Sequence, residues 1–414
     1  MGMAVEGGHT RVLGDGRRSG IWGRAHRSGL VADRRGHQVA PSALILTAHT
    51  GGGHDSVAAA LAEALGEDGS ASVRVWALGD GGRNVLPRDL LYERVVPRAA
   101  WLWDAFYRAT NRESAVCAGT RLATSLWGRS LRKTLLGTRP DLVVSVHPIC
   151  ARLASSVLRT LPQAPPHLCV VTDLVTVHRC WAAPDVAAFY VATKDAGRTL
   201  MRAGVPAERL HVTGLPVRRA FTLPVTPRGT HARPRVLLLG GGRAGLALER
   251  AAFALMRAGS SLELVVVCGR NSRLQRRLLA QAPAGTTVLS WVEDMAALMR
   301  SCDVVVTKAG SVSIAEAASL SRPLIIYDVL PGQEEGNVAL LESERLGRYV
   351  GNVEDLPAAI GEVLERGGTS WPAPQHGWAS ATQRVVDGMA AVVGIARPQE
   401  TALQGAAALS HGSA

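Results

Sequence analysis

The stretch ALILTAHTGGGH, residues 43–54, decides the fold that we expect of this chain of 414 residues. Its first six residues form a short apolar run of the kind that builds a buried parallel strand. Three glycines, Gly51 to Gly53, follow, and an amphipathic segment from Ser56 to about Gly66 predicts a helix. A strand, a glycine-rich turn and a helix in this order predict the opening of a doubly wound α/β domain.

The same opening recurs in the second half of the chain. The apolar run RVLLL at 235–239 leads to three glycines at 240–242, and a helix is expected to start near Leu246. Further buried-strand runs alternate with helical stretches and lie at 141–146, 168–171, 262–267, 303–306 and 323–326. This alternation predicts parallel sheets, so we expect an α/β fold of two Rossmann-like domains that face each other across a cleft.

Composition divides the chain into five segments. Residues 1–40 are rich in glycine and arginine and lack the apolar stretch of a secretory signal, which predicts a disordered basic tail. Residues 398–414 are equally tail-like. Between the tails we expect a first Rossmann-like domain at 41–223, a linker rich in Pro, Thr and Arg at 224–234, and a second domain at 235–397.

The formal net charge of +12 favours an anionic partner: nucleic acid, an anionic membrane surface or a phosphate-bearing substrate. Readers of nucleic acid usually show a basic stripe interleaved with aromatic residues, or a known motif; neither is visible, so no nucleic-acid partner is expected. The six cysteines are scattered without a C-x-x-C pair, which predicts no zinc site and fits a reducing compartment. No apolar run approaches the ~20 residues that span a bilayer.

The first glycine-rich turn is the first candidate for chemistry. Glycines such as Gly52 and Gly53 between a strand and a helix let the backbone approach a ligand and direct free amides at an anion. The spacing is not that of the G-x-G-x-x-G dinucleotide motif. His54 is expected at the N-terminus of the helix, where the positive helix end favours the neutral imidazole of a general base. The alternative is a histidine that caps or packs the helix.

Polar residues after later strands make up the other candidates. Asp173 and His178 follow the run at 168–171, where they can orient a substrate hydroxyl, although Asp173 can equally cap the next turn. The segment at 307–317 can cradle a diphosphate with its small residues, offset phosphate charge with Lys308 and hold a ribose with Glu316. The alternative for Glu316 is a solvated helix face.

Two more segments carry candidate residues. At 331–337, Gln333, Glu334 and Asn337 can hydrogen-bond sugar hydroxyls, although the segment alone indicates only a turn. The stretch at 84–138 combines tryptophans with many arginines on expected helices. This combination suits a membrane interface, and the alternative is a solvated helical pair with its Trp residues in the core.

In this order the segments resemble the monogalactosyldiacylglycerol synthase family of GT-B glycosyltransferases and, more distantly, the lipid-linked N-acetylglucosaminyltransferase of peptidoglycan synthesis. The resemblance runs from about residue 43 to about residue 364. It rests on TGGGH at 50–54, SVHP at 145–148, VTD at 171–173 with His178 and Trp181, GLPVR at 214–218, GGG at 240–242, CGRN at 268–271, TKAG at 307–310, IAEA at 314–317 and PGQEEGN at 331–337.

The resemblance implies an inverting enzyme that moves a hexose from a UDP-sugar to a lipid acceptor such as diacylglycerol, with no metal or other cofactor. It implies a cytoplasmic protein, peripherally bound to the anionic inner face of the plasma membrane. His54 becomes the candidate base, with Asp173 beside it. Donor binding is expected of Gly241, Gly242, Arg243, Arg270, Lys308, Gly310, Ser311, Ser313, Glu316, Gln333, Glu334 and Asn337. Contact with the acceptor or membrane is expected of Gly52, Gly53, Trp101, Trp103, Arg108, His178 and Trp181.

The chain departs from the family pattern at four places. The family usually has Asp where His49 stands and a basic residue where Asp55 stands. It has Pro-Gly at 311–312, where this chain has Ser-Val, and Gly-Phe at 290–291, where this chain has Ser-Trp beside the expected uracil pocket. Two other readings stay open: a glycosyltransferase with a soluble or natural-product acceptor, and a sugar-nucleotide epimerase on a similar two-domain fold.

Overall fold

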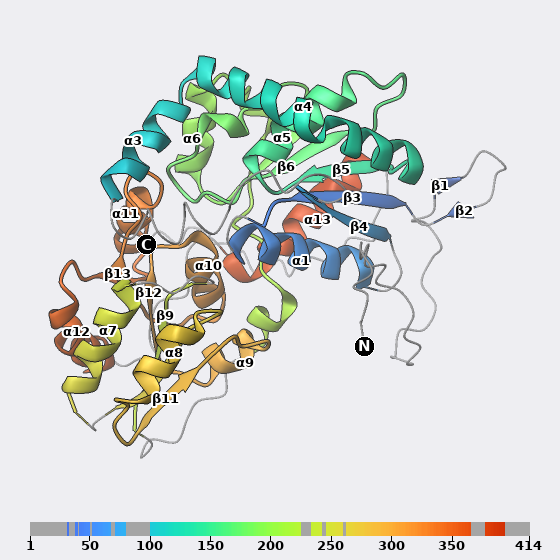
Figure 1. The fold of residues 1–414 in the computed structure, drawn as a ribbon. Helices are drawn as coiled ribbons and strands as arrows, with labels where there is room; N and C mark the ends of the chain where they lie inside the picture. Colours follow the sequence, from blue (N-terminus) through green and yellow to red (C-terminus); the bar gives the residue numbers. More distant parts are fainter. Residues whose placement is uncertain are drawn as a thin grey trace, which may run out of the picture.

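The computed structural model of the chain describes residues 31–32, 38–39, 41–49, 52–67, 71–79, 100–224, 233–241, 246–259, 262–365 and 377–393. Figure 1 shows two bodies, each built from a sheet with helices against it. The fold predicted from the alternating strand and helix patterns is confirmed.

The apolar runs of the first half form a sheet with the strand order β4-β3-β5-β6-β7-β8. Every neighbouring pair is parallel, and the register sets Leu46, Ser145 and Cys169 side by side. The C-terminal ends of β3, β5 and β6 therefore meet at one edge. The strands are β3 (Ser42–Thr47), β4 (Ser72–Ala77), β5 (Leu142–Ser145), β6 (His167–Val170), β7 (Ala188–Val191) and β8 (Leu210–Val212).

The second half forms a similar parallel sheet with the order β11-β10-β9-β12-β13-β14. Its strands are β9 (Arg235–Leu239), β10 (Glu263–Val267), β11 (Thr286–Leu289), β12 (Val304–Lys308), β13 (Leu324–Asp328) and β14 (Gly347–Tyr349). A short antiparallel pair, β1 (Val31–Ala32) with β2 (Gln38–Val39), lies in the segment predicted as a tail.

Helices connect the strands. The α-helices are α1 (Gly52–Gly66), α3 (Ala100–Thr110), α4 (Glu113–Thr138), α5 (Pro148–Leu158), α6 (Lys194–Arg202), α7 (Leu246–Arg257), α8 (Ser272–Leu279), α9 (Met295–Arg300), α10 (Ser311–Ser319), α11 (Glu335–Ser343), α12 (Leu356–Glu365) and α13 (Ala381–Val392). Single 3₁₀ turns are η3 (Arg179–Trp181), η4 (Ala207–Arg209), η5 (Arg219–Thr222), η6 (Val353–Asp355) and η7 (Trp378–Ser380).

The first helix begins earlier than the sequence pattern predicts. We expect it from Ser56, but α1 starts at Gly52, because the second and third glycines of the turn take helical backbone angles. The earlier start places His54 two residues inside α1, in its first turn, which agrees with its expected position at the N-terminus of the helix.

Helices cover both faces of the first sheet. Leu44 and Leu46 of β3 pack with Trp127 of α4 and Leu153 of α5 in one buried cluster. The alternate residue Ile45 belongs to another cluster, which includes residues of α1 and α13. The period-2 alternation along β3 thus places α4 and α5 on one face of the sheet, and α1 and α13 on the other.

The last helix packs on the first half, although it follows the second half in the sequence. The side chain of Arg384 in α13 donates to the carbonyl of Thr213 (Nε to O, 3.0 Å), and the hydroxyl of Thr382 donates to the carbonyl of Val217 (2.7 Å). Sequence reasoning places this segment in the second domain, whereas its helix packs against α1 of the first. The predicted domain bounds thus stay a prediction, with α13 crossing between them.

Candidate functional site

The imidazole of His54 is fixed by the ends of two neighbouring strands. Its Nδ1 lies 2.8 Å from the carbonyl oxygen of Val146, after β5, and 3.0 Å from Oγ1 of Thr172, after β6. A carbonyl oxygen can only accept, so Nδ1 carries the hydrogen and Nε2 of the neutral ring keeps its lone pair. The ring of His147 stands edge-on with its centroid 4.4 Å away. His54 therefore presents one basic nitrogen in a fixed orientation.

The surroundings keep His54 neutral. Burial lowers the pKa of His54 below the ordinary 6.5, while the hydrogen bond to the Val146 carbonyl and the negative charge of Asp55 act in the opposite direction. A histidine that is neutral at pH 7 can accept a proton from a bound hydroxyl. Position and charge both suit the general base predicted from the sequence.

Asp173 is a buried carboxylate with protein donors around it. Nε1 of Trp181 donates to Oδ2 of Asp173 at 2.9 Å, and the backbone N–H of His178 and the side chain of Gln333 donate to the same carboxylate. Burial raises the pKa of Asp173 to about 6. Because Gln333 belongs to the second half, Asp173 links the two domains. These contacts favour a positioning role, and the predicted catalytic role stays a prediction.

His178 holds the segment after β6 against α3, and Trp181 anchors the same segment in the core of the first domain. Nδ1 of His178 accepts from the N–H of Cys180 at 3.1 Å, so its hydrogen is on Nε2, which lies 3.3 Å from Oγ1 of Thr110. The ring of Tyr107 stands edge-on to His178, 5.1 Å away. Trp181 is fully buried. His178 thus contacts α3, whereas Trp181 lies in the core of the first domain and reaches the site through Asp173; their predicted contact with the acceptor stays a prediction.

In the second domain, Lys308 lies between two glycine positions. A methyl group added to Gly241, which has a φ of +74°, would lie 3.3 Å from Cε of Lys308, and one added to Gly310 would lie 3.6 Å from its Nζ. Nζ donates to Glu334. The ammonium group therefore stands where the turns after β9 and β12 converge, which suits a phosphate-bearing ligand.

The start of α10 supplies further donors. Gly310 is the N-cap without a side-chain cap, and Ser311 and Ser313 are half-buried in the first turn. N–H groups in a first helical turn have no carbonyl one turn earlier and are therefore available to an anion. The predicted residues Gly241, Lys308, Gly310, Ser311 and Ser313 are brought together here.

Two buried polar side chains lie behind this turn. Burial raises the pKa of Glu316 to about 8, and the positive charge of Arg218 opposes the shift. Nδ2 of Asn337 donates to the carbonyl of Ala309 at 2.8 Å, while its buried Oδ1 has no hydrogen-bond partner among the described residues. Sugar hydroxyls can form hydrogen bonds with a carboxyl group and with an amide oxygen that can still accept one.

The two domains come into contact at three glycine positions. A methyl group on Gly53 would lie 3.4 Å from Cγ2 of Val312, so the first turn of α1 faces the first turn of α10. A methyl group on Gly336 would lie 2.7 Å from Cγ1 of Val175, and one on Gly332 would lie 2.7 Å from Oδ1 of Asp104. The segment 331–337 is thus enclosed by α3 and by the segment after β6.

The remaining predicted residues, for the donor and, in the case of Gly52, for the acceptor or membrane, make few contacts. Arg270 is exposed and stacks over the ring of Trp291, with its Cζ 4.6 Å from the ring centroid. Gly52 starts α1, and no atom lies within 4 Å of a methyl group built on it. The predicted residues Gly242 and Arg243, and the first two residues of the TGGGH motif, lie outside the described residues.

The Trp- and Arg-rich stretch divides into buried and exposed parts, and its residues before Ala100 lie outside the described ranges. Trp127 is in the core, as the alternative interpretation expects, whereas Trp101 is 70% exposed and Phe106 is 52% exposed on α3. Trp103 is half-buried, and the exposed Arg108 pairs with Asp104 on the same helix (Nε to Oδ1, 2.8 Å). In the part of the chain that is described, no helix is both long and apolar enough to cross a bilayer.

Sequence reasoning missed several groups of the site. Thr172 and the carbonyl of Val146 orient His54, Arg218 faces Glu316, and Asp104 with Tyr107 borders the segment 331–337. Thr172 belongs to the motif VTD and Arg218 to the motif GLPVR. These motifs were the sequence signal that could have identified both residues. Nothing in the sequence points from α3 to the segment 331–337.

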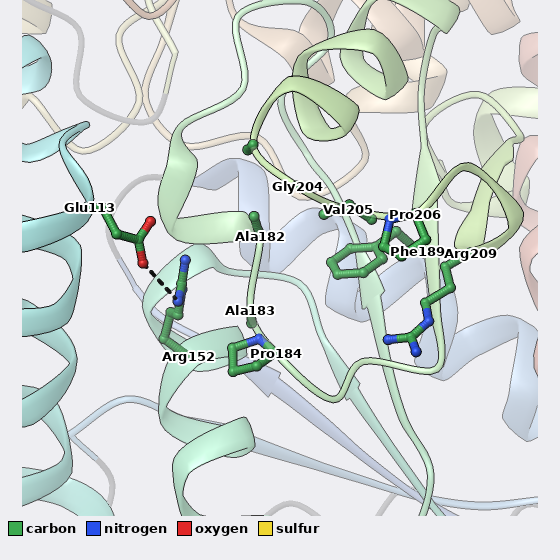
Figure 2. Close-up of a pocket in the computed structure, with 11 residues that line it drawn as sticks. Glu113, Arg152, Ala182, Ala183, Pro184, Phe189, Gly204, Val205, Pro206 and Arg209 are labelled. Atoms are coloured by element: carbon green, nitrogen blue, oxygen red, sulfur yellow. Dashed lines mark ion pairs between the residues drawn. The ribbon is translucent and has the colours of Figure 1, made fainter.

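A cavity of about 470 Å³ lies elsewhere in the first domain. Figure 2 shows Arg152, beside Glu113, on one side of it and Arg209 on the other. Phe189 of β7 and Val205 after α6 also line it. None of the predicted site residues lines this cavity, so the cavity is separate from the candidate site.

The fold has close counterparts among solved structures. The S. aureus MnaA–UDP complex is similar over 86% of this chain and 98% of that chain, with a TM-score of 0.59 and 14% sequence identity. At that identity the likeness concerns the fold alone. Two parallel Rossmann-like sheets with glycine-lined turns facing each other define a GT-B type of fold.

Sequence comparisons identify the family. The family model for monogalactosyldiacylglycerol (MGDG) synthase matches residues 54–217, and that for the glycosyltransferase family 28 C-terminal domain matches residues 236–365. The processive diacylglycerol beta-glucosyltransferase of Bacillus cereus (strain B4264) is 31% identical over 316 residues, covering 73% of this chain and 80% of that protein. The chain belongs to the MGDG synthase family of glycosyltransferases, which confirms the family named from its motifs.

A plant relative is similar over a smaller share of its length. The probable chloroplastic monogalactosyldiacylglycerol synthase of Glycine max is 31% identical over 351 residues, which is 77% of this chain. The matched region spans 64% of the length of that plant protein.

Proposed function

We propose that this protein is an inverting glycosyltransferase that moves a hexose from a UDP-sugar to a lipid acceptor such as diacylglycerol. The observation that carries the proposal is the pair of facing helix starts. His54, with a free basic nitrogen, stands on one wall, and the donor-rich first turn of α10 with Lys308 stands on the other. The two relatives, by name a processive diacylglycerol beta-glucosyltransferase and a probable monogalactosyldiacylglycerol synthase, support the substrate class.

The proposed reaction follows from this arrangement. Nε2 of His54 takes the proton of the acceptor hydroxyl, whose oxygen attacks the anomeric carbon from the face opposite the diphosphate. The bond from that carbon to the diphosphate oxygen breaks, and its electron pair leaves with UDP. Lys308 and the N–H groups that open α10 stabilise the added negative charge. The scheme uses the UDP-sugar as donor substrate and involves no other cofactor.

The polar groups behind α10 would select the donor. In the proposed complex Glu316 accepts hydroxyls of the ribose, while Gln333, Glu334 and Asn337 contact the sugar. The unpartnered Oδ1 of Asn337 supports this assignment, since a buried amide oxygen without a partner is costly unless a ligand completes it.

The acceptor side would rest on a membrane. Trp101 and Phe106 expose their rings on α3, and α4, which follows it (Figure 1), carries an outward stripe of leucines and cations at helical spacing. The stripe consists of Leu122, Leu126, Arg129, Lys133 and Leu136. After Glu113, α4 contains no acidic residue. Apolar and cationic side chains together suit an anionic lipid surface, which we propose is the inner face of the plasma membrane.

The test is a transfer assay with the full chain. Vesicles that contain diacylglycerol, incubated with UDP-glucose, UDP-galactose or UDP-N-acetylglucosamine, should yield UDP and a glycolipid with one of the donors. The variant His54→Ala should lose ~10²-fold or more in turnover, the scale of general-base catalysis, while UDP still binds. His211→Ala, at an exposed histidine of β8, is the matched control.

The other outcomes identify the rival functions. If no UDP-sugar binds, the proposal fails. UDP-sugar that is converted without any acceptor would indicate an epimerase, and transfer to a soluble aglycone without binding to vesicles would indicate a natural-product glycosyltransferase. Full turnover of His54→Ala would remove this histidine from the mechanism.

A further inference from the structure

The carboxylate of Asp55 ties the start of α1 to the end of β3. Its Oδ1 lies 3.0 Å from Oγ1 of Thr47, the last residue of the strand, and its Oδ2 lies 2.8 Å from Nδ1 of His49. The strand and the helix are therefore connected by side chains as well as by the chain between them. His49 is largely exposed, so the pair is open to solvent on one side.

His54 and Asp55 anchor the same helical turn on different sides. His54 reaches the ends of β5 and β6, through Val146 and Thr172, while Asp55 reaches the end of β3. Successive residues of a helix point about 100° apart, so the side chains of His54 and Asp55 reach different groups. The first turn of α1 is thus held against the ends of three adjacent strands, by His54 at β5 and β6 and by Asp55 at β3.

The same carboxylate contributes to the charge around the base. The groups that face His54 are the Val146 carbonyl, Thr172, the ring of His147 and Asp55. Of these, the carboxylate of Asp55 is the one formal charge that raises the pKa of His54 against the effect of burial. Asp55 therefore acts on the charge state of His54 as well as on its position.

We propose that Asp55, held by Thr47 and His49, is a positioning residue for His54. It fixes the first turn of α1 over the cleft and keeps a negative charge beside the base. This inference rests on the proposed function, because it assumes that His54 accepts the proton of the acceptor hydroxyl.

The test is the pH profile of kcat/KM for glycolipid formation by the full chain. Asp55→Asn keeps the shape of the side chain and removes its charge. Activity falls as pH falls through the pKa of His54, since the base must be neutral. Removing a charge that raises this pKa should move the acid limb to lower pH, with a small change in the plateau. Asp195→Asn, which removes an acidic residue from the first turn of α6, should leave the profile unchanged.

Two further variants separate position from charge. Asp55→Ala also removes the contacts to Thr47 and His49, and we expect the plateau to fall by ~10- to 10²-fold, the effect of a displacement near 1 Å. The double variant His49→Asp with Asp55→Lys reverses the pair, so the contact stays while a cation stands beside His54. Its acid limb should lie at lower pH than that of Asp55→Asn.

The results separate this inference from the proposed function. Superimposable pH profiles for the wild type and Asp55→Asn, or full turnover by Asp55→Ala with normal thermal unfolding, would overturn the role of Asp55. Loss of turnover in His54→Ala in the same experiment would leave the proposed function standing. If His54→Ala retains turnover, the proposed function fails first, and this inference fails with it.

Discussion

The substitution Gly336→Ala tests whether turnover needs the close contact between the two domains. Gly336 is the second residue of α11, and a methyl group there would lie 2.7 Å from Oγ1 of Thr176, 2.7 Å from Cγ1 of Val175 and 2.8 Å from its Cβ. The segment after β6 carries these atoms and belongs to the first domain. The change therefore inserts one methyl group into the interface, next to Gln333 and Asn337.

The magnitude follows from contact distances. Carbon atoms pack at about 3.5–4.0 Å, so the two segments must separate by roughly 1 Å. Alanine favours a helix over glycine by up to about 1 kcal/mol, so the second domain itself should not lose stability. A misplacement near 1 Å at the reacting groups can cost ~10²-fold, and we expect kcat/KM to fall by between ~10- and ~10²-fold.

The assay compares glycolipid formation with thermal unfolding. Gly361→Ala in α12 is the matched control, because no atom lies within 4 Å of a methyl group built on this glycine. Gly336→Ala should lose activity without a fall in Tm, and Gly361→Ala should keep its activity. Wild-type kcat/KM in Gly336→Ala would refute the reasoning, since the contact seen between α11 and the segment after β6 would then be unnecessary.

Three further predictions concern the donor and the membrane. Lys308→Met removes a cation from the proposed diphosphate site, and calorimetry should show UDP affinity reduced by ~10-fold or more, as for a charge-assisted hydrogen bond. UDP affinity should rise as pH rises through about 8, because ribose hydroxyls donate to the ionised form of Glu316, and Glu316→Gln should abolish this dependence. The double variant Trp101→Ser with Phe106→Ser should lose ~10-fold or more in binding to anionic vesicles, while Leu279→Ser, at another exposed apolar residue, should not.

Each of these three predictions would be contradicted by a specific result. Unchanged UDP affinity in Lys308→Met would place the diphosphate away from the start of α10. A flat affinity between pH 6.5 and 8.5 in the wild type would mean that the ribose does not contact the carboxyl group of Glu316. Equal vesicle binding by the Trp101 and Phe106 variant would move the lipid-binding surface away from α3.

Most strands in the interior of the two sheets could be predicted because their sequences are locally unambiguous; the exception is β7, an interior strand of four residues that was not among the predicted runs. β3, β5 and β9 are continuous apolar runs, and such runs in alternation with helices have few other stable arrangements. β8 and β14 were not predicted, because each has three residues at a sheet edge and mixes polar with apolar side chains. Their place depends on the neighbouring strand and not on their own sequence.

The types of the residues and the order of the motifs along the chain were enough to select the candidate site residues. A histidine after three glycines, and a lysine, a glycine and a glutamate after a strand, are informative wherever they lie, because their chemistry is local. The motif order also led to the family. These conclusions needed no coordinates, since the C-terminal ends of parallel strands always meet at one edge of a sheet.

Only the tertiary structure decided how these residues act on one another. It assigned the hydrogen of His54 to Nδ1 through the Val146 carbonyl, joined Asp173 to Gln333 across the cleft, and connected Asp55 with His49. Each of these depends on distances between groups that are remote along the chain or on different sides of one turn. A one-dimensional pattern records which groups are present, but hydrogen bonds and pKa shifts depend on atomic separation and burial, which exist only in the folded molecule.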